Sequence, residues 1–203
     1  RTSAAVAATD NPNINAPLNQ QQQVTFIPFN NAQALEKELQ RGDVCAVIFE
    51  PLQGVGGLDQ PKDDFVLKME QLCQQYETAL IADEVQSGFS RSGTFFAFQN
   101  NNIKPHVITM AKGMGNGFPI GGILVHPDVK PKYGMLGTTF GGNHLACTAS
   151  LAVLEILKKD KLQQLAKAME TYFRSKAEKI KGAKIKGRGL MLGLEFDFEV
   201  GPL

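Results

Sequence analysis

Short apolar runs alternate with amphipathic stretches along most of the chain. Each run is too short for a buried helix and ends in polar or glycine-rich residues, which is typical of buried strands. We expect these strands at 44–49, 79–82, 107–110 and 120–125. Helical spacing of apolar residues predicts helices over 32–41 and 63–77. Strands that alternate with helices indicate an α/β fold with a mainly parallel sheet.

The pattern changes in the last part of the chain. Helical spacing over 143–159 and 161–181 is followed by an alternation of apolar residues from Ile185 to Leu194, which predicts strand structure. We therefore expect two domains, a partial large domain at 1–159 and the beginning of a small α+β domain at 160–203.

Three further segments complete the prediction of secondary structure. The Asn-, Gln- and Pro-rich stretch from Asp10 to Gln23 reads as a surface loop. A short strand is expected at 24–27, and a short helix at 94–100.

Lys112 and Asp83 are the residues that suggest a chemistry. Lys112 follows the strand expected at 107–110, with alanine before it and a glycine-rich run after it, which leaves space for an amine that forms an imine with a bulky ligand. Asp83 ends the strand expected at 79–82, and such a carboxylate faces a ligand crevice. Taken alone, Lys112 fits an ordinary loop lysine and Asp83 a helix cap. Together they favour pyridoxal phosphate, whose pyridine nitrogen needs an acid to keep it protonated.

Five separated segments resemble the class III pyridoxal-phosphate aminotransferases. They are Phe-Glu-Pro-Leu-Gln-Gly at 49–54, Leu-Ile-Ala-Asp-Glu-Val-Gln-Ser-Gly-Phe-Ser-Arg-Ser-Gly at 80–93, Ala-Lys-Gly-Met-Gly-Asn-Gly-Phe-Pro-Ile-Gly-Gly at 111–122, Gly-Thr-Thr-Phe-Gly-Gly-Asn at 137–143 and Arg-Gly-Leu-Met-Leu-Gly-Leu-Glu at 188–195. Within this family the chain most resembles the acetylornithine aminotransferases. The resemblance implies the fold of type I pyridoxal-phosphate enzymes, with a large domain and a smaller C-terminal domain.

The resemblance also implies roles for residues of the cofactor site. Lys112 would be the catalytic lysine that holds the cofactor and moves the proton, and Asp83 would pair with the pyridinium nitrogen. Val85 would pack under the ring, from the same strand face as Asp83, and Gln86 would reach the phenolic oxygen. Without the motif, Val85 is equally a plain core residue and Gln86 a surface residue of a turn.

Thr138 and Thr139 are the expected phosphate ligands. In the family this segment serves the cofactor of the neighbouring subunit, so the resemblance implies a homodimer whose active site is shared across the interface. The alternative is a turn in which both hydroxyls bond only to their own backbone.

Arg1 and Glu50 are the candidates for substrate binding. Arg1 matches a family position that contacts a substrate carboxylate, although a first residue can also fray. Glu50 resembles a structural acid near the active site, and it fits equally a partner for a nearby base. Arg188 is a more distant candidate for a carboxylate, and we expect a structural role for Glu84, in a bond to backbone or to an arginine such as Arg91.

Two positions depart from the family pattern. Val55 stands where ornithine-processing relatives often carry a second glutamate, which argues against ornithine as the substrate. His106 stands where an aspartate usually precedes the strand leading to Lys112, and we expect it to be a surface or capping residue. The three histidines show no metal-ligand spacing, so no metal is expected.

Composition excludes several classes of function. The chain is 43% hydrophobic and 20% charged, with a net charge of +1, so no nucleic-acid footprint is visible. No apolar run is long enough to span a bilayer, and the three cysteines fit buried, reduced thiols, so we expect a cytoplasmic protein. Family members continue upstream of the residue that matches Arg1, and we therefore expect this chain to be a fragment.

The expected reaction is transamination of N-acetylornithine, or of N-succinylornithine, with 2-oxoglutarate. It would give the semialdehyde and glutamate by ping-pong kinetics, as a step of arginine biosynthesis. Three alternatives stay open: another class III ω-aminotransferase for ornithine or 4-aminobutyrate, an aminomutase or decarboxylase with the same cofactor, and a noncatalytic fragment or subunit-interface module. Large exposed apolar patches would indicate the last of these.

Overall fold

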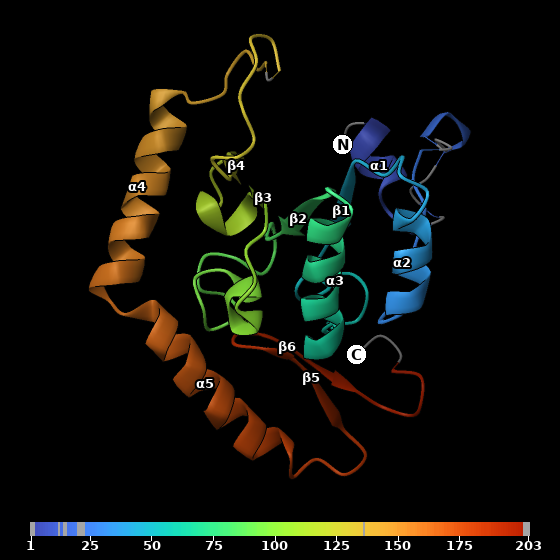
Figure 1. Ribbon diagram of the computed structural model, residues 1–203. Coiled ribbons are helices and arrows are strands. Elements are labelled where there is room, and N and C mark those ends of the chain that lie inside the picture. Colours follow the sequence, from blue (N-terminus) through green and yellow to red (C-terminus); the bar gives the residue numbers. More distant parts are fainter. Residues whose placement is uncertain (1–2, 12, 14–15, 20–22, 136, 201–203) are drawn as a thin grey trace.

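A four-stranded sheet forms the centre of the computed structural model, which describes residues 3–11, 13, 16–19, 23–135 and 137–200 (Figure 1). Its strands, in spatial order, are β1 (Ala46–Phe49), β2 (Ala79–Asp83), β3 (Val107–Met110) and β4 (Gly122–Val125). The first three run parallel, and β4 pairs with β3 in the antiparallel direction. The predicted α/β fold with a mainly parallel sheet is confirmed.

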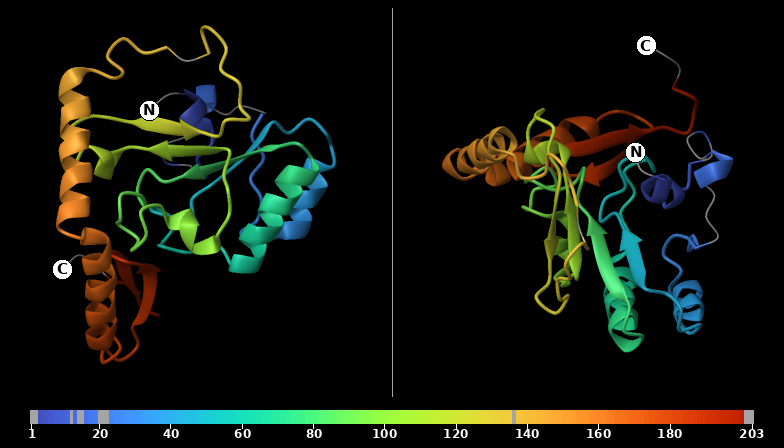
Figure 2. Two further views of the ribbon diagram at one scale, coloured as in Figure 1. Left: turned by 60° about the vertical axis from the view of Figure 1, so that its left-hand side comes forward. Right: turned by 90° about the horizontal axis from the view of Figure 1, so that it is seen from above.

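Two helices lie side by side and pack with the sheet, α2 (Ala32–Leu39) and α3 (Asp63–Gln75) (Figures 1 and 2). Their apolar faces form the main core with β2 and with phenylalanines of the segment after it. The side chain of Asn31 accepts a hydrogen bond from the backbone N–H of Ala34 and so caps α2, which satisfies one of the free donors at that helix end. The acidic first turn of α3 is favourable there because helix dipoles attract negative charge.

The remaining short elements show where the sequence pattern misleads. Residues 24–27 form no strand, because this run packs Ile27 against the core but pairs with no neighbouring strand. The helix expected at 94–100 is a 3₁₀ helix, η2 (Ala97–Asn101). Three more short helices are α1 (Ser3–Ala7), η1 (Pro17–Asn19) and η3 (Lys112–Met114).

The last part of the chain forms a bent helical arm and a hairpin (Figure 2). The arm consists of α4 (His144–Lys159) and α5 (Leu162–Ala177), and it bends at Lys161, which has a left-handed φ of +51°. The bend lies at the boundary expected from the sequence, whereas the division into domains at that point stays a prediction. The hairpin pairs β5 (Lys184–Arg188) with β6 (Met191–Glu195).

The β5–β6 hairpin docks on the loop that follows β2. The backbone N–H of Leu190 donates to the carbonyl of Arg91 at 2.8 Å. Gly189 has a φ of +63°, and an added β-carbon there would lie 2.4 Å from the same carbonyl oxygen of Arg91. Only glycine permits both the left-handed turn and this close approach of the two backbones.

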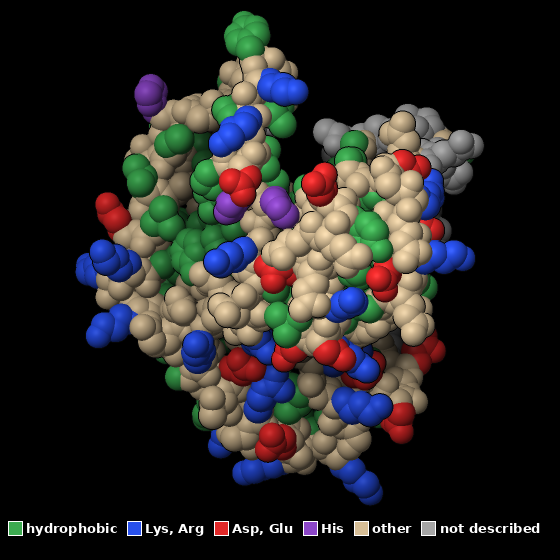
Figure 3. All heavy atoms as spheres, viewed as in Figure 1, with side chains coloured by type: hydrophobic (Ala, Val, Ile, Leu, Met, Phe, Trp, Pro, Cys, Tyr) green, Lys and Arg blue, Asp and Glu red, His purple; other side chains and the backbone are tan. Residues whose placement is uncertain are grey.

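Large apolar side chains are exposed along α4 and the neighbouring β4. Figure 3 shows hydrophobic side chains along this side of the molecule and in a hollow beside it. Those at least 40% exposed are Leu145, Leu151, Leu154 and Ile156 in α4 and Ile123, Leu124 and Val125 in β4. An apolar surface of this extent is typical of a face that another chain or segment covers.

His106 completes the hydrogen-bonded ladder between β2 and β3. Its Nδ1 accepts a hydrogen bond from the backbone N–H of Leu80 at 3.0 Å, and its own N–H donates to the Leu80 carbonyl at 2.8 Å. The histidine therefore caps the entry to β3, as expected for a capping residue. Among the described residues no cluster of His, Cys, Asp or Glu could hold a metal ion, and none of their helices is both long and apolar enough to cross a membrane.

The three cysteines are free thiols, but only one is buried. Cys73 lies in the core, whereas Cys45 and Cys147 are exposed, so the expectation of burial was wrong for these two. Both lie among apolar residues in the sequence, but their side chains are on faces that no other part of the described chain covers. Burial raises the pKa of the Cys73 thiol to about 12, and the charge of Glu70 adds to this effect.

We predict that the native protein reacts at Cys45 and Cys147 but not at Cys73 with a thiol reagent at pH 8. The thiolate is the reactive form, and a thiol with a pKa of about 12 contains almost none of it at that pH. Labelling followed by peptide mapping, with the denatured protein as the control, measures this difference. Rapid native labelling of Cys73 would contradict the burial seen in the structure.

Candidate active site

Three charged residues meet at the carboxyl ends of the parallel strands. Glu50 follows β1, Asp83 ends β2, and Lys112 follows β3 after one intervening residue. The strand register pairs Phe49 with Ala82 and Asp83 with Thr109, so these strand ends lie at the same edge of the sheet. The carboxyl edge of an open α/β sheet is where ligands bind.

The charges of Asp83 and Lys112 act on the carboxyl of Glu50. Burial raises the pKa of the Glu50 carboxyl most strongly, and the negative charge of Asp83 raises it further. The hydrogen bond from the Gly54 N–H and the positive charge of Lys112 lower it. Glu50 therefore lies within electrostatic range of both Asp83 and Lys112, and the structure brings together three residues that the sequence analysis selected separately.

Asp83 is held by two donors and keeps one free oxygen. Its Oδ1 accepts from the backbone N–H of Val85 at 3.0 Å and from the hydroxyl of Thr109 at 3.1 Å. Within the described part of the chain, Oδ2 accepts no hydrogen bond. The carboxylate is thus fixed in orientation while one oxygen stays available to a cationic N–H group.

Lys112 is held in an unusual backbone conformation. Its φ is +45°, a left-handed value that costs free energy for a residue with a β-carbon and that occurs often at functional sites. The residue is exposed, and no ion pair of the described residues involves its amine. The amine is therefore accessible for reaction with a ligand.

Gln86 lies in the turn after β2 and packs against the loop after β1. An added β-carbon at Gly54 would lie 2.0 Å from Nε2 of Gln86, so the glutamine side chain occupies the space that a larger residue at 54 would need. The backbone N–H of Gly54 in turn donates to Glu50 at 2.8 Å. These contacts place Gln86 beside the charged group.

The structure changes the argument for Val85. We expected it to share a strand face with Asp83, but β2 ends at Asp83 and Val85 lies in the following turn. That turn forms because the Val85 N–H bonds to the Asp83 carboxylate, which ends the strand pairing. The expected contact between Val85 and a cofactor ring stays a prediction without the strand argument.

Glu84 has the structural role expected for it. Its carboxylate is buried and accepts hydrogen bonds from the hydroxyl of Ser87 and the backbone N–H of Phe98. The expected bond was to backbone or to an arginine such as Arg91, and the structure shows the backbone bond.

The structure does not bring the other candidate residues into this group. Thr138 and Thr139 are exposed in the loop between β4 and α4, and no contact of theirs with Glu50, Asp83 or Lys112 is formed among the residues described. Arg1 lies outside the described residues. The roles of these three residues stay predictions.

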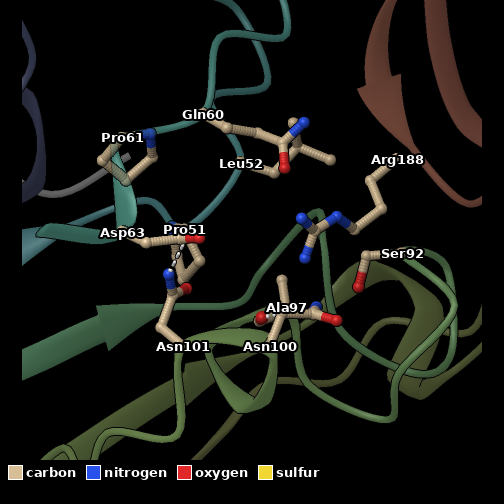
Figure 4. Close-up of a pocket in the computed structure, with 10 residues that line it drawn as sticks. All are labelled: Pro51, Leu52, Gln60, Pro61, Asp63, Ser92, Ala97, Asn100, Asn101 and Arg188. Carbon is tan, nitrogen blue, oxygen red and sulfur yellow. Dashed lines mark hydrogen bonds between the residues drawn. The ribbon is translucent and has the colours of Figure 1, made fainter.

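Arg188 points into a different, small pocket between the β5–β6 hairpin and the segments that follow β1 and β2. Figure 4 shows its guanidinium among the side chains of Leu52, Ala97 and Ser92. The cavity is about 10 Å³, room for roughly one water molecule, and its lining includes none of the three charged residues. The role considered for Arg188, binding of a substrate carboxylate, stays a prediction.

Sequence reasoning missed two residues that shape the site, Thr109 and Gly54. Thr109 donates to Asp83 only because β2 and β3 pair in a register that no local sequence pattern specifies. Gly54 permits the close approach of Gln86, and the segment 49–54 that contains it carried the family resemblance without indicating this contact.

The residues at the sheet edge fit pyridoxal phosphate. The free Oδ2 of Asp83 suits a pyridinium N–H, and the accessible amine of Lys112 suits an imine with the aldehyde. Gln86 offers an amide donor at the side of the same group. Within the described part of the chain, the expected phosphate ligands Thr138 and Thr139 form no hydrogen bond with this group.

Comparison with known proteins identifies relatives over nearly the whole chain. The family model described as aminotransferase class-III matches residues 1–201. The acetylornithine aminotransferase of Aquifex aeolicus is 40% identical over 177 residues, which are 86% of this chain and 46% of that protein. The chain spans about half the length of the curated relatives it matches.

Solved structures agree with the fold. The ornithine aminotransferase from Toxoplasma gondii ME49 has a TM-score of 0.85 at 30% identity, over 97% of this chain and 49% of that one. The acetylornithine aminotransferase from Elizabethkingia anophelis has a TM-score of 0.76 at 31% identity, over 85% of this chain and 45% of that one. The fold of type I pyridoxal-phosphate enzymes is therefore confirmed.

We predict that Thr109→Val weakens binding of pyridoxal phosphate by roughly threefold to tenfold. The substitution removes a donor to Asp83, and this weakening corresponds to about 0.7–1.4 kcal/mol, within the range of about 0.5–1.5 kcal/mol for the net contribution of a typical hydrogen bond. The dissociation constant is measured by absorbance titration with the cofactor. Thr109→Ser keeps the hydroxyl and is the matched control, so equal weakening in both variants would show that the bond to Asp83 is not the cause.

Proposed function

The chain belongs to the class III aminotransferases, and on this basis we propose that the protein transfers an amino group from N-acetylornithine, or from N-succinylornithine, to 2-oxoglutarate. The products are the corresponding semialdehyde and glutamate. The observation that carries the proposal is the position of Lys112 and Asp83 at the ends of neighbouring parallel strands. Members of this family depend on pyridoxal phosphate.

Pyridoxal phosphate supplies an electron sink that stabilises negative charge on the carbon bearing the amine. Oδ2 of Asp83 would accept a hydrogen bond from the pyridinium N–H, while the Thr109 hydroxyl and the Val85 N–H keep the carboxylate in place. Lys112 would hold the cofactor through Nζ, and its amine would also serve as the base that takes a proton from the substrate carbon and returns it. The side-chain amide of Gln86 would donate a hydrogen bond to the phenolic oxygen of the cofactor.

Two observations favour an N-acylated ornithine over ornithine. The curated relatives named above and several more are called acetylornithine aminotransferases. Val55 is 80% exposed in the loop that also contains Gly54, so the loop presents an apolar side chain where a carboxylate would pair with a second amine. An acylated ornithine has only one free amine and does not need this pairing. Similar solved structures named ornithine aminotransferase keep ornithine as the alternative.

A homodimer is part of the proposal. The exposed apolar side chains of α4 and β4 support a second copy as the cover of this face. Thr138 and Thr139 lie in the loop that leads into α4, so a partner on α4 would also contact the residues proposed to hold the neighbouring phosphate. A cytoplasmic location stays a prediction.

The same apolar face supports a second candidate, a noncatalytic module. Its exposed leucines and isoleucines would then serve only to associate with another chain. The accessible amine of Lys112 and the free oxygen of Asp83 favour catalysis, because an interface module needs neither.

We predict that the protein forms a borohydride-trapped adduct with pyridoxal phosphate at Lys112. Lys112→Ala removes the adduct and lowers turnover of N-acetylornithine by at least about a hundredfold, because the amine both binds the cofactor and moves the proton. Absorbance spectra, reduction and peptide mapping measure the adduct. The control is Lys104→Ala, which changes an exposed lysine away from the site.

The outcomes of this experiment separate the two candidates. An adduct at Lys112 that is lost only in Lys112→Ala supports the aminotransferase. Absence of any adduct in the unmodified protein contradicts catalysis by this chain and favours the module. An adduct at another lysine shows that Lys112 was assigned wrongly.

For the substrate, we predict a kcat/KM for N-acetylornithine at least about tenfold above those for ornithine and 4-aminobutyrate, a difference of about 1.4 kcal/mol. Val55→Glu should lower the ratio of kcat/KM for N-acetylornithine to kcat/KM for ornithine, since the new carboxylate can pair with the second amine of ornithine. Val55→Gln has the same size without the charge and is the matched control. Ornithine as the better substrate of the unmodified protein would reverse the assignment.

A further inference from the structure

Two adjacent carboxylates leave β2 with opposite surroundings. Asp83 is partly exposed and faces the site, whereas Glu84 is 0% exposed. A buried carboxylate is tolerated only when hydrogen bonds replace its hydration. Oε2 of Glu84 accepts from the hydroxyl of Ser87 at 2.6 Å, and Oε1 accepts from the backbone N–H of Phe98 at 2.8 Å.

Glu84 closes the turn that contains Val85 and Gln86. Its carboxylate bonds to Ser87, and its carbonyl accepts from the N–H of Gly88 at 3.0 Å. At the other side, its N–H donates to the carbonyl of Thr109 at 3.0 Å, which attaches the start of the turn to β3. Both the backbone and the side chain of Glu84 therefore determine the shape of this turn.

The bond to Phe98 extends the effect to the rest of the loop. Phe98 lies in η2, where the chain returns to the core, so Glu84 connects the beginning and the end of the segment from 84 to 98. This segment includes Arg91, whose carbonyl receives the N–H of Leu190 from the β5–β6 hairpin. The buried carboxylate of Glu84 thus holds the loop to which the β5–β6 hairpin is hydrogen-bonded.

Asp83 and Gln86 differ in their dependence on this turn. Asp83 has the hydroxyl of Thr109 as a donor outside the turn, so its orientation does not rest on Glu84 alone. The Gln86 side chain forms no hydrogen bond within the described residues and is placed by its packing against Gly54. Its direction therefore follows the backbone of the turn.

We propose that Glu84 is a positioning residue of the cofactor site, which fixes the turn that presents Gln86 through its bonds to Ser87 and Phe98. The proposal rests on the proposed function for its meaning, because Gln86 needs a fixed direction only if pyridoxal phosphate binds beside it. Glu84 itself does not touch the cofactor.

Two serines of the same loop provide a matched pair of variants. Ser87 and Ser92 are both 1% exposed, but the Ser87 hydroxyl bonds to Glu84, whereas the Ser92 hydroxyl has no partner among the described residues. Ser87→Ala and Glu84→Gln should shift or broaden the side-chain amide signal of Gln86 in ¹⁵N NMR spectra. Ser92→Ala should leave that signal in place.

Cofactor binding tests the consequence. We expect Ser87→Ala and Glu84→Gln to weaken binding of pyridoxal phosphate about threefold to tenfold and to shift its absorbance maximum. In a double-mutant cycle, Glu84→Gln should cause no further weakening once Gln86 is alanine, because both substitutions remove the same contact. A merely structural role of Glu84 predicts additive effects.

The outcomes distinguish this proposal from the proposed function. Additive effects, an unchanged Gln86 signal in Ser87→Ala, or an equal change in Ser92→Ala would each overturn the positioning role. If the unmodified protein binds no pyridoxal phosphate, the proposed function fails, and the Gln86 amide signal still decides whether Glu84 fixes the turn. Ser87→Ala keeps the test available if Glu84→Gln does not fold.

Discussion

Parallel pairing of β1, β2 and β3 is the constraint on which the site depends. Parallel strands need long crossover connections, which here are α3 and the segment between Asp83 and His106. Because the strands are parallel, their carboxyl ends lie at one edge of the sheet. Glu50, Asp83 and Lys112 are therefore close in space although they are far apart in the chain. A change that shifts the pairing of Asp83 with Thr109 would disturb the strand pairing and the orientation of the aspartate at once.

The turn after β2 shows how local stability and an open site coexist. Asp83 keeps one oxygen without a donor, and Lys112 holds a left-handed conformation, so both residues carry a free-energy cost where a ligand would bind. The neighbouring Glu84 fixes the turn beside them, because its N–H, its carbonyl and both carboxylate oxygens are hydrogen-bonded inside the protein. Burial raises the pKa of the Glu84 carboxyl, and hydrogen bonds from Ser87, Phe98 and Ala97 oppose that rise. The residue that fixes the turn, Glu84, and the residue that faces the site, Asp83, are therefore consecutive in the chain.

Local patterns were enough for most elements and for the two central residues. Apolar runs and helical spacing predicted the strands of the main sheet, and glycines beside Lys112 with a strand-end acid at Asp83 predicted the chemistry now supported by family membership. Properties that depend on distant partners could not be predicted in this way. The run at 24–27 lacks a strand to pair with, and the contact of Thr109 with Asp83 exists only in the observed register.

The uncovered face of α4 links folding to the remaining part of the site. Only Ala146 and Ser150 are buried in this 16-residue helix, and most helical stability in proteins comes from packing of an apolar face. The exposed leucines of α4 and Ile156 therefore gain most from burial against a surface that the described chain does not supply. The loop with Thr138 and Thr139 ends at Asn143, which caps α4 through the N–H of Ala146. A partner that packs on α4 would therefore also fix the end of this loop. Association at the apolar face and binding of the phosphate by this loop are then coupled.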